Sequence, residues 1–251
     1  DPHTVALADG TRVTAKYILI ATGGWPVKPD IPGADLGITS NEVFHLESLP
    51  RRVIIAGGGY IANEFAGIFN SFGSQVTLVN RSDAILRGYD EQIRDRLLQI
   101  SMAKGIQFRF NCPFEKIEKN ADGSLAVHVT GADPIETDLV LFATGRAPNV
   151  SGLGLAEAGV ELASNGAVRV DAWSKSSVDS IYAVGDVTDR VQLTPVAIRE
   201  GHAFADTVFG GKPVAVDHET IPMAVFSHPP MAGVGLTEAQ ARNRLGTVRT
   251  Y

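Results

Sequence analysis

Residues 53–62 read Val-Ile-Ile-Ala-Gly-Gly-Gly-Tyr-Ile-Ala and decide the fold of this chain. The four apolar residues predict a buried strand, and the GxGxxA pattern that follows predicts a turn into a helix. Gly57 permits the tight turn, Gly59 lets a pyrophosphate approach the backbone, and Ala62 lets helix and strand pack closely. With Tyr60 and Ile61 between them, these residues form a candidate dinucleotide-binding turn at a helix N-terminus. The alternative is a glycine-rich turn without a ligand.

The residues after this turn continue a βαβ pattern. Apolar side chains recur at the spacing of one helix face, namely Ile61, Phe65, Ile68, Phe69 and Phe72. Gly73 stands where a glycine ends a helix, and residues 75–80 predict the next strand. We therefore expect a strand, helix and strand in the order of a dinucleotide-binding unit.

Further elements complete an α/β domain around this unit. A second helix is expected from Asp90 to the pair Lys104-Gly105, on the apolar residues Ile93, Leu97, Leu98 and Ile100. Strands are expected at 106–110, 114–119 and 125–130, and a last buried strand at 138–145. A parallel βαβ core with a three-stranded excursion predicts an α/β fold.

The flanking regions have weaker patterns. Residues 4–8 and 12–20 predict two strands joined by the turn Asp9-Gly10. Residues 25–50 hold six Pro or Gly residues and are interpreted as a connection. Short strands are expected at 168–170 and 181–184, a helix from about 195 to 209, and the opening of another α/β domain at 216–251.

Composition excludes several functional classes. The net charge of −6 makes the chain a poor partner for nucleic acid. Cys112 is the single cysteine and the six histidines are scattered, so no disulfide or metal site is expected. No apolar run approaches 18 residues and no signal peptide is seen, so we expect no membrane association and a cytoplasmic location. The start at Asp1-Pro2 and the stop at Tyr251 suggest a fragment of a longer protein.

The tip of the second strand indicates which dinucleotide is bound. An Asp or Glu at this point usually binds the ribose 2′-hydroxyl of NAD. Here the sequence is Asn80-Arg81, with Arg87 following, and guanidinium groups suit the 2′-phosphate of NADPH. Two charge-assisted hydrogen bonds of about 1.5–3 kcal/mol each would favour NADPH by roughly two or three orders of magnitude. Asp83 lies nearby and is an alternative partner for an arginine.

Two further motifs end apolar strands. Ala-Thr-Gly-Gly at 21–24 and Ala-Thr-Gly-Arg-Ala-Pro-Asn at 143–149 flank the dinucleotide unit and suggest crossovers between neighbouring domains, with Gly145 and Arg146 at the second crossover. Residues 181–186 predict a strand that ends at Asp186, where the carboxylate can accept hydrogen bonds from a chain of hydroxyl groups on a ligand. Taken alone, each motif indicates only a strand that runs into a loop.

Together these motifs resemble the flavin-dependent disulfide reductases of the glutathione reductase type. The resemblance rests on residues 57–67, 143–149, 181–189, 193–201 and 225–238, and covers essentially the whole chain. It implies a Rossmann-like NADPH-binding domain at 50–147, with a parallel sheet and a three-stranded β-meander. This domain would be inserted in part of an FAD-binding domain (1–49 and 148–215), with the start of a C-terminal dimerisation domain at 216–251.

The resemblance also implies residue roles. Tyr60 is similar to the tyrosine that covers the nicotinamide pocket, and Glu64 to the glutamate near the nicotinamide amide. Arg81 and Arg87 match the 2′-phosphate arginines. Asp186 resembles the aspartate that binds the flavin ribityl chain, and Thr194 the residue whose backbone faces the flavin ring.

Two family features are absent from these residues: the redox-active cysteine pair and the segment with the acid–base histidine. Cys112 matches neither redox position and is expected to be an inert buried thiol. His228 belongs to a strand that enters the next domain, so no catalytic residue is expected in the chain.

The implied activity is NADPH-dependent reduction of glutathione disulfide, with NADPH and FAD as cofactors and a homodimer as the intact enzyme. We expect this chain alone to be inactive and to hold little or no flavin. It contains only the start of the dimerisation domain, so a monomer is the alternative to a dimer. The alternatives are a related reductase of the mercuric or dihydrolipoamide type, and a non-catalytic NADPH-binding module.

Overall fold

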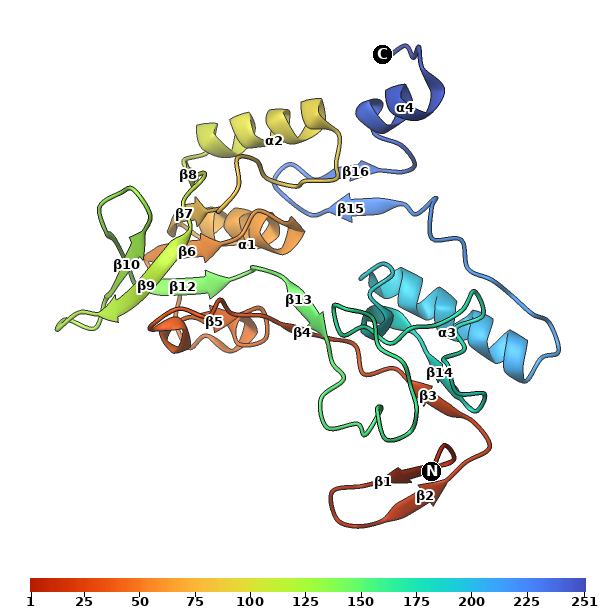
Figure 1. The fold of residues 1–251 in the computed structure, drawn as a ribbon. Coiled ribbons are helices and arrows are strands. Elements are labelled where there is room, and N and C mark those ends of the chain that lie inside the picture. Colours follow the sequence, from red (N-terminus) through yellow and green to blue (C-terminus); the bar gives the residue numbers. More distant parts are fainter. The chain divides into compact units, whose positions relative to one another are not determined.

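The computed structural model describes residues 1–251 and divides them into two compact units (Figure 1). Unit 1 comprises residues 1–25 and 146–219, and unit 2 comprises residues 26–145 and 220–251. In sequence, the first segment of unit 2 is therefore inserted between the two segments of unit 1.

Unit 2 is built on a five-stranded sheet in the order β5-β12-β6-β7-β8. Every neighbouring pair in this sheet is parallel. The strands are β5 (Ile38–Thr39), β12 (Leu139–Phe142), β6 (Arg52–Ala56), β7 (Gln75–Val79) and β8 (Gln107–Arg109). The predicted α/β fold with a parallel sheet is confirmed.

Two helices connect the central strands at the expected positions. Helix α1 (Tyr60–Ser71) joins β6 to β7 and is followed by Gly73, whose φ of 92° lies in the left-handed region that favours glycine. Helix α2 (Glu91–Ala103) is capped by Asp90, whose side chain accepts a hydrogen bond from Gln92 N. The βαβ unit and the second helix are both confirmed.

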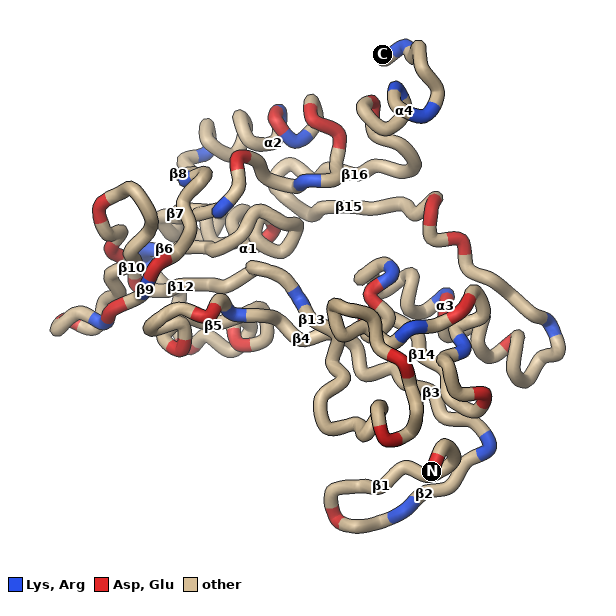
Figure 2. Tube along the Cα trace, in the orientation of Figure 1, with Lys and Arg blue, Asp and Glu red and all other residues tan.

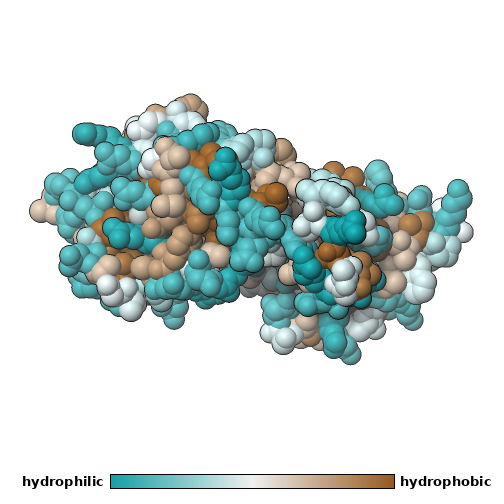
Figure 3. Space-filling model, turned by 90° about the horizontal axis from the view of Figure 1, so that it is seen from above, coloured by the Kyte–Doolittle hydropathy of each residue, from teal (hydrophilic) through white to brown (hydrophobic).

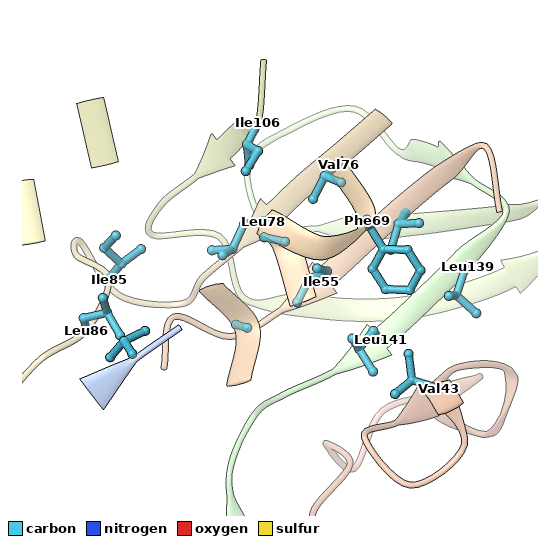
Figure 4. Close-up of a cluster of buried hydrophobic side chains, with 14 of the residues drawn as sticks. Val43, Ile55, Phe69, Val76, Leu78, Ile85, Leu86, Ile106, Leu139 and Leu141 are labelled. Carbon is cyan, nitrogen blue, oxygen red and sulfur yellow. The ribbon is translucent and has the colours of Figure 1, made fainter. Parts of the chain in front are cut away.

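The sheet is buried on both faces, which explains its continuous apolar strands. Successive residues of β6 alternate between two core clusters, with Val53 and Ile55 in the first and Ile54 and Ala56 in the second. The first cluster contains side chains from α1 and α2, including Phe69 (Figure 4). The second contains apolar residues of the meander, so helices cover one face and the meander covers the other.

The remaining elements of unit 2 are short. The meander has the order β11-β10-β9, with β9 (Phe114–Lys119), β10 (Leu125–Val129) and β11 (Ile135–Thr137). Two 3-10 helices precede β6, η1 (Ala34–Leu36) and η2 (Val43–His45). The C-terminal segment forms β15 (Met223–Val225), β16 (Met231–Gly233) and α4 (Glu238–Leu245), and Val225 is fully buried in the first core cluster.

Unit 1 pairs strands that are distant in sequence. Its elements are β1 (Thr4–Ala6), β2 (Arg12–Thr14), β3 (Ile18–Ile20), β4 (Gly24–Pro26, of which Pro26 belongs to unit 2), β13 (Arg146–Pro148), β14 (Ile181–Ala183), η3 (Gly185–Thr188) and α3 (Thr194–Val208). Strands β1 and β2 form the expected hairpin, β3 pairs with β14 in parallel, and β4 pairs with β13.

Three sequence predictions differ from the structure. The strand expected at 12–20 is two strands, because β2 pairs within the hairpin while β3 pairs with the distant β14. No strand occupies 168–170, where Val168 makes only an isolated bridge to Leu162. The connection at 25–50 contributes β5, whose pairing with β12 no local pattern reveals.

The surface is mixed in charge and hydropathy. Acidic and basic residues alternate along the chain rather than forming a stripe of one sign (Figure 2). On the face shown in Figure 3, apolar areas lie among hydrophilic residues. None of the helices is both long enough and apolar enough to cross a membrane.

Candidate dinucleotide-binding site

The turn after β6 requires glycine at its first position. Gly57 has a φ of 127°, and a Cβ placed there would lie 2.3 Å from the carbonyl oxygen of Ala143. The Gly57 amide also donates to the carbonyl oxygen of Val79, 2.9 Å away on the neighbouring strand. A side chain would therefore push apart the ends of three adjacent strands.

The next two glycines differ in what surrounds them. A Cβ on Gly58 would lie 2.4 Å from the side-chain nitrogen of Asn80, so this position is closed by protein. A Cβ on Gly59, the N-cap of α1, would meet no atom within 4 Å. The open side of the turn is therefore at Gly59, where the sequence predicts the approach of a pyrophosphate.

Asn63 braces the turn from inside the helix. Its side chain is buried, and Nδ2 donates to the carbonyl oxygens of Gly58 at 3.1 Å and Gly59 at 2.8 Å. Sequence reasoning missed this residue. An amide side chain on the apolar face of a helix, one turn after the glycines, is the signal that would have identified it.

The loop after β7 is tied to the same turn. Asn80 is buried, and its Nδ2 donates to Ser82 Oγ and to the carbonyl oxygen of Ala84, each at 2.9 Å. The Leu86 amide donates to the carbonyl oxygen of Gly58 at 2.7 Å. These bonds hold the loop that carries both candidate arginines against the glycine turn.

A cavity of about 560 Å³ opens at this junction. Five of the predicted residues line it, namely Gly57, Gly59, Arg81, Arg87 and Gly145. Its wall also contains residues that the sequence did not single out, including Lys28, Phe114 and Thr144. The cavity therefore combines an uncapped helix N-terminus with cationic side chains, an arrangement suited to a ligand with more than one phosphate.

The two arginines differ in their surroundings. Both are exposed, but Arg87 donates to Asp83 across 2.6 Å, whereas no acidic side chain pairs with Arg81. The hydrogen bond from Arg87 holds the pKa of Asp83 below its ordinary value. The alternative partner foreseen for an arginine is thus present, and a phosphate would have to share Arg87 with it.

The other candidates on α1 lie outside the lining of this cavity. Ala62 is fully buried against the sheet, while Tyr60 is half-buried beside the first core cluster. Ile61 is also half-buried, and Glu64 Oε1 accepts a hydrogen bond from the Phe226 amide at 2.9 Å. Burial raises the pKa of the nearby Tyr89, with smaller contributions from Tyr60 and Glu64.

The helix face predicted from the large apolar residues is only partly the buried face. Ala62, Ala66 and Phe69 pack against the sheet, whereas Phe72 is 71% exposed. Small side chains face the sheet because the turn holds α1 close to β6. The helix itself was predicted correctly, but its orientation follows the alanines.

The remaining candidates belong to unit 1. Asp186 lies in η3, directly after β14, with its Oδ2 3.8 Å from Arg146 Nε. Arg146 Nη2 donates to the carbonyl oxygen of Gly24 at 2.6 Å. Thr194 is the first residue of α3, where no side chain caps the helix and Pro195 follows. An exposed, uncapped N-terminus of this kind can stabilise negative charge on a ligand.

Two residues set aside by the sequence analysis have ordinary partners. Cys112 is half-buried rather than buried, and its Sγ donates to the carbonyl oxygen of Phe110 at 3.1 Å. His228 Nδ1 lies 3.0 Å from Ser71 Oγ. The chain contains no cluster of three or more His, Cys, Asp or Glu side chains that could hold a metal ion.

Known proteins resemble the chain in both sequence and fold. It is 52% identical to a glutathione reductase of Burkholderia cepacia over 250 residues, covering 100% of this chain and 55% of that protein. It is 49% identical to a trypanothione reductase of Leishmania donovani, covering 100% of this chain and 51% of that protein. The chain thus spans about half the length of these curated relatives.

A solved structure of a disulfide reductase has a similar fold. The HOCl-induced flavoprotein disulfide reductase RclA from Escherichia coli superposes with a TM-score of 0.91 at 32% identity, over 96% of this chain and 56% of that one. The family model described as pyridine nucleotide-disulphide oxidoreductase matches residues 1–201. This chain therefore belongs to the pyridine nucleotide-disulphide oxidoreductase family.

Proposed function

We propose that this chain is the NADPH-binding part of a flavin-dependent disulfide reductase that acts on glutathione disulfide. The observation that carries the proposal is the cavity lined by Gly57, Gly59, Arg81 and Arg87. The glycine turn would hold the pyrophosphate, and the two guanidinium groups would bind the 2′-phosphate of the adenosine ribose. Bound NADPH would supply a hydride that FAD relays to a disulfide.

The remaining predicted residues extend this proposal. Tyr60 and Glu64 would form the nicotinamide end of the site, Ile61 and Ala62 would belong to the turn that binds the pyrophosphate, and Gly145 would complete the wall of the cavity. In unit 1, Arg146 and Asp186 would orient the flavin, and the uncapped backbone at Thr194 would face its ring. From the sequence we propose an NADPH-binding domain at 50–147, flanked by FAD-binding segments at 1–49 and 148–215. In the structure, residues 26–49, which include β5, belong to unit 2 with the NADPH-binding segment.

Glutathione disulfide is proposed as the substrate because glutathione reductases are among the relatives with the highest identity. A trypanothione reductase at 49% identity makes trypanothione the second candidate substrate. The mercuric and dihydrolipoamide types stay as alternatives from the sequence. The arginine pair argues against the NAD-linked dihydrolipoamide type. The homodimer of the intact enzyme and the cytoplasmic location also stay predictions.

Calorimetric titration of the chain with NADPH and NADH, in buffer free of phosphate, tests the cofactor. We expect binding of NADPH to be tighter by about two orders of magnitude, and Arg81→Met and Arg87→Met each to reduce this ratio. Arg96→Met, an exposed arginine on α2 outside the cavity, is the matched control and should leave the ratio unchanged.

Two outcomes would overturn the assignment. Equal affinity for the two dinucleotides would show that the arginines are surface charge and would favour the NAD-linked alternative. A fall in the ratio for Arg96→Met as large as for Arg87→Met would show that net charge, rather than a built phosphate site, sets the preference.

A further inference from the structure

A fully buried carboxylate lies in unit 1, outside every role assigned above. Glu200 is on α3 and is 1% exposed, with three hydrogen-bond donors around it. Its Oε2 accepts from the Gly185 amide at 2.6 Å, and its Oε1 lies 2.9 Å from Arg190 Nη2 and 2.7 Å from His218 Nε2. An ionised carboxylate only accepts hydrogen bonds, so His218 donates through Nε2.

Arg190 is itself hydrogen-bonded to the turn that follows β14. Arg190 Nε donates to Thr188 Oγ1 at 3.2 Å, and Thr188 Oγ1 donates to the carbonyl oxygen of Gly185 at 2.9 Å. Burying a carboxylate is costly unless it is paired and hydrogen-bonded, and here both of its oxygens are occupied. The cluster therefore holds the turn, α3 and the segment around His218 at one point.

Its position connects two elements of the proposed flavin site. Gly185 directly precedes Asp186, and Thr194 begins the same helix that carries Glu200. The turn also lies close to this helix, because a Cβ on Gly185 would come within 3.2 Å of Ala197 Cβ. The distance between the Asp186 carboxylate and the N-terminus of α3 is thus set through the bond from Gly185 to Glu200.

We propose that Glu200 is a positioning residue for the flavin site, and that it acts by locking the Asp186 turn onto helix α3. The inference rests on the proposed function, because it assigns a purpose to the position of Asp186 and Thr194. Glu200 itself contacts no ligand in this role. Only a carboxylate satisfies the arrangement, since a glutamine amide would turn its NH₂ group toward a donor on one side or the other.

Two selective labelling schemes make the hydrogen bond from the Gly185 amide observable by NMR. Labelling with ¹³C′-valine and ¹⁵N-glycine selects the Val-Gly pairs 184–185 and 234–235, and the sequence contains no others. Gly235 belongs to unit 2 and is the internal reference. Labelling with ¹³C′-glycine and ¹⁵N-aspartate selects the single Gly-Asp pair, 185–186, and reports on Asp186.

We expect the Gly185 amide proton to resonate far downfield of that of Gly235, because its bond to a carboxylate is short and charge-assisted. Glu200→Gln should move the Gly185 and Asp186 signals and speed hydrogen exchange at Gly185 by about tenfold to a hundredfold, with Gly235 unmoved. Glu157→Gln removes a charge from an exposed site in the same unit and should move none of them. If Glu200→Gln does not fold, Arg190→Lys is the second variant. It keeps the positive charge but loses the planar guanidinium group, and it should move the Gly185 amide signal by a smaller amount.

The inference is overturned if the parent Gly185 amide resonates beside Gly235, or if Glu200→Gln lowers stability while the Asp186 signal stays in place. The second result would make Glu200 only a stabilising core residue. Neither result bears on NADPH binding, which is measured on the parent chain by calorimetry. Failure of this inference and failure of the proposed function are therefore distinguishable.

Discussion

Replacing Asn63 with alanine removes the side-chain amide that braces the glycine turn. The two hydrogen bonds that are lost, to the carbonyl oxygens of Gly58 and Gly59, contribute about 1 kcal/mol each. Neither carbonyl is left without a partner, because Gly58 keeps the Leu86 amide and Gly59 keeps the amide of residue 63. We therefore expect unit 2 to lose about 2 kcal/mol, a factor of roughly 30 in its unfolding equilibrium.

Urea unfolding followed by two signals separates this effect from a general one. Both tryptophans, Trp25 and Trp173, belong to unit 1, so their fluorescence reports chiefly on that unit. Circular dichroism reports on both units. Asn63→Ala should shift the transition seen by circular dichroism to lower urea and leave the fluorescence transition in place.

The brace should also affect ligand binding in a characteristic way. The pyrophosphate is common to NADPH and NADH, so a looser turn should weaken both affinities by the same factor. Asn70→Ala, on the same helix, is the matched control, because its Nδ2 donates to Lys104 at 3.3 Å, away from the turn. The reasoning is refuted if Asn63→Ala and Asn70→Ala cost the same stability, or if Asn63→Ala changes the ratio of the two affinities.

Two further predictions concern unit 2. Gly57→Ala should prevent the folding of unit 2, because Cβ would lie 2.3 Å from the carbonyl oxygen of Ala143, whereas Gly59→Ala should fold normally and bind NADPH less tightly. Circular dichroism measures the stability of the two variants and calorimetry their affinity for NADPH. Equal stability of the two variants would contradict the prediction. A hydrogen bond from Arg52 lowers the pKa of Asp138 in the folded chain. The ionised Asp138 carboxylate therefore contributes fully to the free energy of unfolding above its unfolded pKa of about 3.9, and this contribution is lost as the pH falls through the lower folded pKa. The urea midpoint of the parent should therefore exceed that of Asp138→Asn between pH 5 and 7 and converge with it in acid, and a constant difference down to pH 2 would disprove the linkage.

Local sequence determined the central unit of the fold. An apolar strand, a glycine turn and a helix are specified by residues close together in the chain, so residues 53–79 were predicted within a residue or two of their observed bounds. The Asp90 cap and the end of α1 before Gly73 follow from the same kind of local rule. The candidate site residues Gly57, Gly59, Arg81 and Arg87 were also available from the motif and the strand that follows it.

Tertiary structure decided what depends on partners distant in sequence. The pairing of β3 with β14 divides the strand predicted at 12–20, and β5 has only two residues and no pattern of its own. The buried face of α1 contains its alanines and Phe69, whereas Ile68 and Phe72 of the predicted face are exposed, because close approach to the sheet selects small side chains.

The residues that support the candidate sites were likewise not predicted from the sequence. Asn63, Asn80 and Glu200 are polar residues whose type predicts an exposed position, yet each is buried. Their burial is possible only because the fold brings backbone groups to them as hydrogen-bond partners, from the neighbouring turn for Asn63 and Asn80 and from the Gly185 turn for Glu200. A sequence motif therefore identifies the groups that can touch a ligand, whereas the residues that hold those groups in place are defined by contacts that exist only in the folded chain.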